Sequence, residues 1–307
     1  MNSIFCLFIP AFVSCFKFDR TRFKEEILSQ ILRVRIPGTN GHQKFIVNQL
    51  LDLKWQVEQD VFLTKTPFHK RLKFTNVIGT LNPLAPNRLV LACHYDSKYF
   101  VPTGQKVFVG ATDSAVPCSI LIYLAQQLTP VLNLHYNVTL QLLFFDGEEA
   151  FLDWSEEDSL YGSRHLADVF SKNHLKKHPH LTCLASIKLF ILLDLLGYKD
   201  PTIASFYQKT EPEFEELCRL ERSLYPHSKT RIFLSPKYDG VNYKMHEVGD
   251  DHKPFNEKGV RIIHLIPLPF PEPWHTFEDD ESIIDMESVE KITSVLYEFI
   301  EQYFKKT

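Results

Sequence analysis

Apolar residues recur every three or four positions in several segments of the chain, which is the spacing of an amphipathic helix. These segments are residues 21–34, 41–53, 115–128, 159–170, 212–225 and 280–304. Proline and glycine mark some of their ends: Pro37 and Gly38 follow the first segment, and Thr129-Pro130 predicts the end of the third. Pro212 falls in the first turn of the fifth helix, where its missing N–H group is not needed.

Short runs rich in apolar and β-branched residues lie between these helices and predict strands. The runs are residues 55–63, 72–81, 88–93, 140–145, 187–193 and 260–266. The run 140–145 is apolar at nearly every position, as expected of a strand buried on both faces of a sheet. Strands and helices mostly alternate without a Gly/Ser-rich linker, so we expect residues 17–307 to form one α/β domain. Its central sheet is expected to be mixed, mostly parallel and flanked by helices.

Residues 1–16 form an apolar leader that is too short to span a bilayer. Small residues near Ser14 and Cys15 make it resemble the core of a signal peptide, although the usual preceding basic residues are absent. We therefore expect secretion, or retention in the lumen of the endoplasmic reticulum or Golgi, without stable membrane insertion. A misplaced start codon and a buried amino-terminal segment are the alternatives. The glycosylation sequon at Asn137 abuts the run 140–145, which leaves its use in doubt.

Composition narrows the class of protein. A hydrophobic content of 44% with 25 Phe predicts a substantial core, and a net charge of −4 gives no reason to expect a nucleic-acid partner. Six cysteines are too few for a disulfide scaffold of this size. Whether Cys93 and Cys118 are oxidised stays open, although a bridge between them would tie two candidate active-site segments together. No feature favours oligomerisation, so we expect a monomer.

Polar residues follow each of the buried runs. Because the carboxyl ends of parallel strands meet at one edge of a sheet, these residues are expected to converge on a single site. Each has an ordinary explanation when taken alone, such as a helix cap, a turn or a surface imidazole, but their coincidence favours a site. The residues are His94, Asp96, Asp113, Glu148, Glu149, Asp194 and His275.

The adjacent carboxylates of Glu148 and Glu149 suggest a metal ion. Two such groups repel one another, and an unassisted site would push one of them toward neutrality. A metal ion bound by one carboxylate removes this conflict and frees the other for proton transfer. Imidazole and carboxylate without thiolate form the ligand set of catalytic zinc, in which three protein ligands leave one position open.

Four motifs then resemble one family. G-A-T-D-S-A-V-P-C, F-F-D-G-E-E-A-F-L-x-W, D-S-L-Y-G-S-R-H-L and P-F-P-x-x-W-H-T look like animal glutaminyl-peptide cyclotransferases. The resemblance runs from about Arg35 to the end of the chain and implies a zinc enzyme with the metallo-aminopeptidase fold. It implies the conversion of an amino-terminal glutamine (and possibly glutamate) of peptides and proteins to pyroglutamate, with one zinc ion per chain.

Carried over position by position, the resemblance implies a role for each site residue. Zinc ligands are expected at Asp113, Glu149 and His275, and the acid/base at Glu148. Asp194 and Asp250 are expected to form a hydrogen-bonded acidic pair beside it. The substrate pocket is expected to be lined by Trp154, Phe270 and Trp274, and Cys93 and Cys118 to form a disulfide. One departure is Gly249, where the family pattern would place Gln, which puts one substrate contact in doubt.

Two alternatives remain. A zinc aminopeptidase with one or two metal ions could use His94 and Asp194 as additional ligands, although the bulk of Trp154 and the proline-rich loop before His275 would crowd an extended peptide. A non-catalytic binding module that kept the fold is disfavoured, because every acid that the mechanism needs is present.

Overall fold

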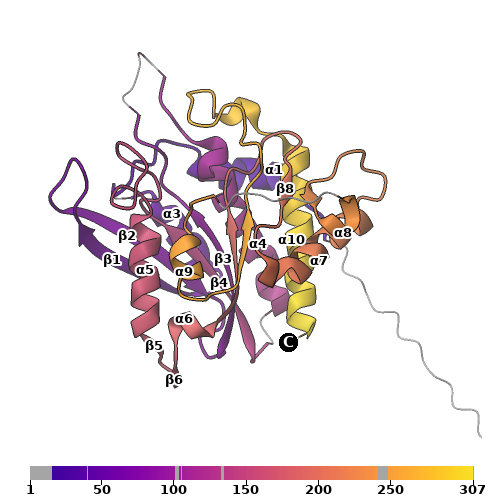
Figure 1. Cartoon of the computed structure of the whole chain (residues 1–307), viewed down its shortest axis with the longest axis horizontal. Helices are drawn as coiled ribbons and strands as arrows, with labels where there is room; N and C mark the ends of the chain where they lie inside the picture. The colour runs from indigo at the N-terminus through magenta and orange to yellow at the C-terminus, as the bar shows by residue number, and fades with distance from the viewer. Residues whose placement is uncertain are drawn as a thin grey trace, which may run out of the picture.

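A six-stranded sheet crosses the middle of the computed structural model, which describes residues 16–306 except 40, 101–103, 105, 133–134 and 241–247. The strand order is β1-β2-β4-β3-β7-β10 (Figure 1). The pairs β1–β2 and β2–β4 are antiparallel, whereas β4–β3, β3–β7 and β7–β10 are parallel. The prediction of one α/β domain with a mixed, mostly parallel sheet is therefore confirmed. The strands are β1 (Gln56–Thr64), β2 (Leu72–Thr80), β3 (Asn87–His94), β4 (Val138–Phe145), β7 (Ile187–Leu193) and β10 (Ile262–Leu265).

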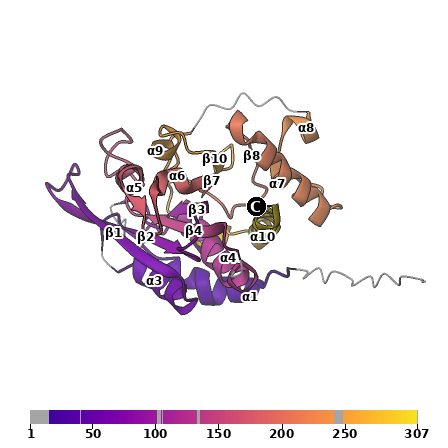
Figure 2. The ribbon, with the colours of Figure 1, turned by 90° about the horizontal axis from the view of Figure 1, so that it is seen from below.

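Helices cover both faces of this sheet (Figure 2). One face carries α5 (Tyr161–Lys172), α6 (Cys183–Ser186) and α9 (Lys253–Asn256). The other face carries α3 (Gln43–Asp52), α4 (Val116–Leu132), α10 (Met286–Lys306) and the consecutive helical segments α1 (Arg20–Arg22), η1 (Phe23–Leu28) and α2 (Ser29–Ile31). Two further helices, α7 (Glu211–Leu224) and α8 (Pro236–Asp239), lie beyond α10.

The chain is already packed at Phe16, which we assigned to the leader. Its ring stacks on Tyr297 with a centroid distance of 4.1 Å and contacts Tyr123 edge-on at 6.3 Å. The folded domain therefore includes Phe16. The rest of the leader lies outside the described residues.

Two helix ends differ from the sequence prediction. Helix α4 continues past Pro130 to Leu132, whose side chain is buried, because a proline in the last turn removes only one hydrogen bond while the burial is retained. The carboxyl-terminal helix begins at Met286 rather than near residue 280, because the Asp285 carboxylate accepts the N–H and Oγ–H of Ser288 at 2.9 and 2.6 Å.

The sequence analysis also missed several short elements. They include the β5–β6 hairpin (His174–Leu175 and His178–Thr182) and the parallel pair β8–β9 (Ile203–Ala204 and Phe233–Leu234). Strands this short carry too few residues for a readable period. One described helical stretch, Ala111–Leu132, is long and apolar enough to cross a membrane, but 72% of its most apolar window is buried inside the fold.

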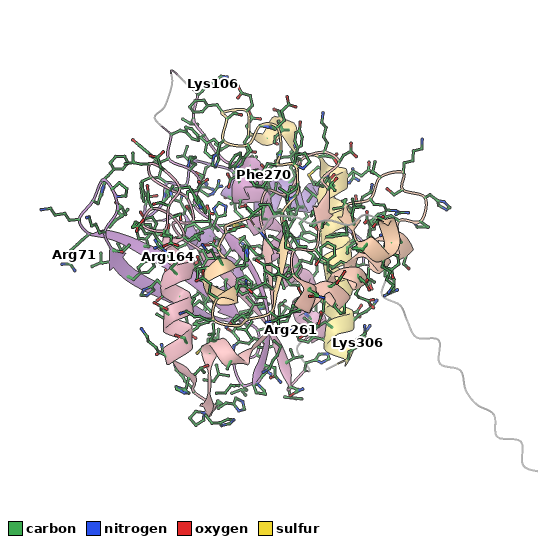
Figure 3. All side chains as sticks on the ribbon, viewed as in Figure 1. Arg71, Lys106, Arg164, Arg261, Phe270 and Lys306 are labelled. Carbon is green, nitrogen blue, oxygen red and sulfur yellow. The ribbon has the colours of Figure 1, made fainter. Side chains whose placement is uncertain are left out.

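The sheet has two functionally different ends. The four strands β3, β4, β7 and β10 run in parallel, so their carboxyl ends lie together at one edge. Figure 3 labels Phe270 at this end and Arg261, which directly precedes β10, at the opposite end. The residues predicted to form the site follow the carboxyl ends of these strands.

Candidate active site

The site residues are held by the loops that leave the strands. Glu148 and Glu149 follow β4, and the buried carboxylate of Asp96, just after β3, accepts both of their backbone N–H groups at 3.2 Å. Asp113 lies in η2 (Ala111–Ala115), immediately before α4. His275 comes from the proline-rich loop after β10 and has a positive φ of 56°.

Asp113, Glu149 and His275 form one compact set of potential metal ligands. One ligand atom from each lies within 4.8 Å of the others. His275 Nε2 is 3.3 Å from Asp113 Oδ2 and 3.4 Å from Glu149 Oε1. Glu149 Oε1 is buried and accepts no hydrogen bond of ordinary geometry from the described residues. Two buried carboxylates and an imidazole that face one another in this way fit a divalent metal ion such as zinc.

The ionisation of this set follows from its burial and its charges. Burial alone would lower the pKa of His275, but hydrogen bonds to Asp113 and Glu149 raise it to about 9. Burial alone would raise the pKa of Asp113, but hydrogen bonds from His275 and His94 hold it well below its usual range. The pKa of Glu149 is raised by burial and by the nearby Asp113 carboxylate. Lys98 offsets part of this repulsion, with its Nζ 3.4 Å from Glu149 Oε2.

A second set joins His94, Asp113 and Asp194, again within 4.8 Å of one another. His94 Nε2 lies 3.1 Å from Asp113 Oδ1 and 3.3 Å from Asp194 Oδ1. The hydroxyl of Ser114 also donates a very short hydrogen bond to Asp194 Oδ1. Within this buried set, Asp194 Oδ1 is thus in contact with both His94 and Ser114.

A cavity of about 220 Å³ opens onto the first set. It brings together all the predicted catalytic, metal-binding and aromatic residues except Asp250, which is buried behind it. The Phe270 and Trp274 rings meet edge-on at 4.8 Å, and Trp274 stacks on the His275 imidazole at 4.0 Å. Trp154 is 48% exposed and Trp274 37% exposed, so these two side chains form a rim between the cavity and solvent.

Glu148 is the carboxylate of this cavity that is not in a potential ligand set. Its side chain is buried, and burial, together with the negative charges of Glu149, Asp250 and Asp251, raises its pKa well above the usual range, against the opposing effect of His94. A carboxylate with a raised pKa is a better proton acceptor and can return the proton later in a reaction.

Asp194 and Asp250, which we expected to form a hydrogen-bonded pair, have other partners in the structure. Asp250 Oδ2 lies 2.7 Å from His264 Nε2, and its Oδ1 accepts the N–H of Asp251 at 2.6 Å. Burial and the negative charge of Asp194 raise the pKa of Asp250 well above the usual range. A direct hydrogen bond between the two acids stays a prediction.

Cys93 and Cys118 lie together beneath the site. Their sulfur atoms are 2.7 Å apart, and both side chains are buried. Burial and the neighbouring Cys118 raise the pKa of the Cys93 thiol well above its usual range. The disulfide that the resemblance implies therefore also stays a prediction.

Some residues that shape the site were missed by the sequence analysis. They are Ser114 on Asp194, His264 on Asp250, and Arg35, whose buried guanidinium donates to the carbonyl oxygens of Val109 and Gly110 just before Asp113. A single histidine in the apolar run 260–266 was the one available signal for His264. The other contacts join residues that are distant in sequence.

Comparison with known proteins identifies the family. Residues 76–300 match Peptidase family M28. A glutaminyl-peptide cyclotransferase from Gloydius blomhoffii is 42% identical over 298 residues, which cover 92% of this chain and 81% of that relative. The chain belongs to the glutaminyl-peptide cyclotransferase family. This membership confirms the resemblance found in the four sequence motifs.

The fold agrees with this family. The crystal structure of Macrostomum lignano glutaminyl cyclase matches with a TM-score of 0.84 at 33% identity, over 93% of this chain and 90% of the other. A Zn-dependent exopeptidase from Parabacteroides distasonis matches with a TM-score of 0.75 at 20% identity, over 94% and 99% of the two chains. Cyclotransferases thus share their fold with exopeptidases, and the second likeness extends to the fold alone.

Proposed function

We propose that the chain is a glutaminyl cyclase, an acyltransferase that converts the amino-terminal glutamine of peptides and proteins to pyroglutamate and releases ammonia. Its membership of the cyclotransferase family supports this activity. The observation that carries it is the small cavity, in which the buried acid Glu148 stands beside a metal-ligand set under an aromatic rim.

In this reaction the α-amine of the glutamine attacks its own γ-amide carbon. A C–N bond closes the ring, the bond to the amide nitrogen breaks, and ammonia leaves. Nucleophile and electrophile belong to one residue, so the main task of the protein is to hold the folded-back conformation. Phe270 and Trp274, fixed edge-on against each other, and Trp154 at the rim are placed to enclose such a residue and exclude water.

Glu148 takes the proton from the α-amine as the ring closes and returns it to the departing nitrogen. Its burial and its raised pKa suit both steps. Asp194 lines the same cavity and is held by Ser114 and His94, which suits a role in stabilising the leaving amide nitrogen. Asp250 supports the site from behind.

We propose Asp113, Glu149 and His275 as the ligands of one zinc ion per chain. When bound, the ion would supply Lewis-acid polarisation of the γ-carbonyl group. The buried Glu149 Oε1, which lacks an ordinary hydrogen bond, supports this assignment. A second ion at His94 and Asp194 would have to break the mutual hydrogen bonds of that set, which favours a single metal ion and disfavours a two-metal aminopeptidase.

The test uses a peptide that begins with glutamine and a mass readout. The metal-loaded protein should reduce the peptide mass by one ammonia, and a heterocyclic chelator should abolish the change. Glu148→Gln should lose activity while it still binds the metal ion, which separates the acid/base from the ligand set. Release of a free amino-terminal residue would instead identify an aminopeptidase, and metal analysis of the same sample counts the ions per chain.

Three further expectations remain proposals. We propose that the protein enters the secretory pathway, on the basis of its apolar leader, that it acts as a monomer, and that Cys93 and Cys118 form a disulfide there. The proximity of the two sulfur atoms supports the disulfide. Mass analysis of the purified secreted protein, with and without reduction, tests the leader cleavage and the disulfide together, and sedimentation tests the oligomeric state.

A further inference from the structure

An arginine with one unpartnered nitrogen lies at the opposite end of the sheet from the active site. Arg88, near the start of β3, is 5% exposed, and its Nη1 is buried without a hydrogen-bond partner among the described residues. Burial lowers the pKa of this guanidinium. The negative charge of Glu58 offsets part of this burial, but a buried N–H group without an acceptor is costly, so Nη1 is expected to have a partner that the described chain does not supply.

Arg88 lines a cavity of about 380 Å³ whose floor is set by the strand register. Glu58 pairs with Ile78 across β1 and β2, and Thr80 pairs with Gln141 across β2 and β4. Val90, two residues after Arg88, pairs with Gln141 across β3 and β4. Because side chains alternate along a strand, these cavity-lining residues and Arg88 lie on the same face of the sheet, with Arg88 two residues along β3 from the position opposite Gln141.

The roof of the cavity is the β5–β6 hairpin. Leu175, Lys176 and Lys177 line the cavity from this hairpin. His178 Nε2 lies 2.9 Å from the carbonyl oxygen of Leu84, in the turn between β2 and β3, which ties the hairpin over the floor. The cavity is thus bordered by the β5–β6 hairpin and by the turn between β2 and β3, and neither segment contributes to the active site.

The charges of the lining favour an anion. Arg88, Lys176 and Lys177 are cationic, and Glu58 is the one acidic residue among the lining residues. The Glu58 carboxylate makes no ion pair with Arg88 in the described structure and instead accepts a hydrogen bond from Gln56 at 2.5 Å. An anion in the cavity could accept the free donor of Arg88 in the charge-assisted geometry that guanidinium groups prefer.

The buried side-chain oxygen of Gln141 indicates that the ligand must also donate a hydrogen bond. Its Nε2 donates to Thr80 Oγ1 at 2.9 Å, while its buried Oε1 has no hydrogen-bond partner among the described residues. A ligand that gives partners to both Arg88 Nη1 and Gln141 Oε1 must therefore accept a hydrogen bond from Arg88 and donate one to Gln141. Phosphate carries a hydroxyl group at neutral pH and can do both, whereas sulfate has only acceptor oxygens.

We propose that this cavity is a binding site for inorganic phosphate, an oxyanion that retains a hydroxyl group at neutral pH. Arg88 binds its charge, Gln141 accepts its hydroxyl group, and Lys176 and Lys177 close over it. The site is separate from the cyclisation chemistry, because it lies at the amino-terminal end of the parallel strands.

The test measures binding of inorganic phosphate and of sulfate by calorimetry and by the rise in Tm, at constant ionic strength. Phosphate should bind to the unmodified protein about tenfold more tightly than sulfate, the difference that one hydrogen bond to Gln141 supplies. Arg88→Gln should weaken phosphate binding about tenfold or more. Arg261→Gln is the matched control, because Arg261 lies at the same end of the sheet but is paired with Glu213 at 2.6 Å.

A second variant keeps the test decisive if Arg88→Gln does not fold. Gln141→Glu places a carboxylate on the same face of the sheet and in the same cavity as Arg88, so it should abolish phosphate binding and raise the Tm of the phosphate-free protein. Phosphate binding that is unchanged in both Arg88→Gln and Gln141→Glu would overturn the proposal and assign the anion to the metal centre. The absence of any phosphate-dependent rise in Tm, or equal binding of phosphate and sulfate, would also overturn it. Glucose 6-phosphate, whose phosphoryl group has mostly lost its hydroxyl proton at neutral pH, should bind no more tightly than sulfate, and binding as tight as that of phosphate would contradict the role of Gln141.

Discussion

The hydrogen bonds of Asp96 lead to a prediction that separates the positioning of the active site from general stability. This buried carboxylate accepts the N–H groups of Glu148 and Glu149, one on each oxygen. Asp96→Asn keeps the shape of the side chain but replaces one acceptor oxygen by an NH2 group. One buried N–H then loses its acceptor and faces another donor.

The loss can be estimated from the structure. A hydrogen bond to a charged group contributes about 1.5–3 kcal/mol, so the free energy of unfolding of the metal-free protein should fall by about that amount. The two peptides that Asp96 holds also carry the proposed base and a proposed metal ligand. Changing the partners that orient such groups typically lowers metal affinity or activity by about 10-fold to 100-fold.

Asp158 provides a matched control. Its two carboxylate oxygens likewise accept the N–H groups of Phe151 and Leu152 at 3.0 and 2.8 Å, beyond the Glu148–Glu149 pair, and its Oδ1 also accepts the hydroxyl of Tyr161 at 2.7 Å. Asp158→Asn should therefore destabilise the protein to a similar degree without the same loss of metal affinity.

The assay combines three measurements on both variants: urea unfolding of the metal-free protein, metal affinity by competition with a chelator, and kcat and KM for cyclisation. If the two variants lose metal affinity and kcat/KM equally, Asp96 acts only through stability and the reasoning is refuted.

The remaining predictions concern one substrate-pocket position, one buried acid and the cysteine pair. Gly249→Ala should leave the protein folded and active and change the unfolding free energy by no more than about 1 kcal/mol. The reason is that a Cβ at this position would meet Trp154 Nε1 at an ordinary contact distance of 3.7 Å. A large loss of stability in urea unfolding would contradict this prediction. Burial raises the pKa of Glu221, so the contribution of its protonated form to stability is present at acidic pH and is lost as the pH rises through the folded pKa. The loss of unfolding free energy caused by Glu221→Gln should therefore shrink from about pH 4 upward. A loss that grows with pH would refute this prediction. Oxidation of Cys93 and Cys118, which are 25 residues apart, should raise the unfolding free energy by about 3.5 kcal/mol relative to the reduced protein, as chemical unfolding of both forms can check.

Much of the fold could be predicted because its signals are local. The strand β7 has the predicted bounds, residues 187–193, since nearly every side chain in it is buried and the run of apolar residues ends where the strand ends. The ends of α4 and α10 could not be predicted in the same way. Burial of Leu132 extends α4 beyond a proline, and the Asp285 cap delays the start of α10, so contacts rather than propensity decide both.

The grouping of the site residues at one edge of the sheet could also be predicted. Parallel strands place their carboxyl ends together, so residues that follow buried runs could be assigned to one edge before the structure was known. His275, which comes from a long proline-rich loop, was assigned to this edge in the same way, and the family motif added its role as a metal ligand. The partners of these residues were not predictable: Ser114 meets Asp194 across 80 positions, and His264 on β10 meets Asp250, which precedes α9.

The sequence by itself therefore determined the α/β class, the family and the identity of the chemical groups at the sheet edge, because period and motif are properties of short segments. Only the tertiary structure decided which carboxylate accepts backbone N–H groups, which polar atoms form hydrogen bonds with one another, and which have no partner. The same distinction applies at the far end of the sheet, where Arg88 and Gln141 look like ordinary strand residues until the register places them on one face, beside the same cavity. Hydrogen bonding is settled by distances between segments that lie far apart in the chain.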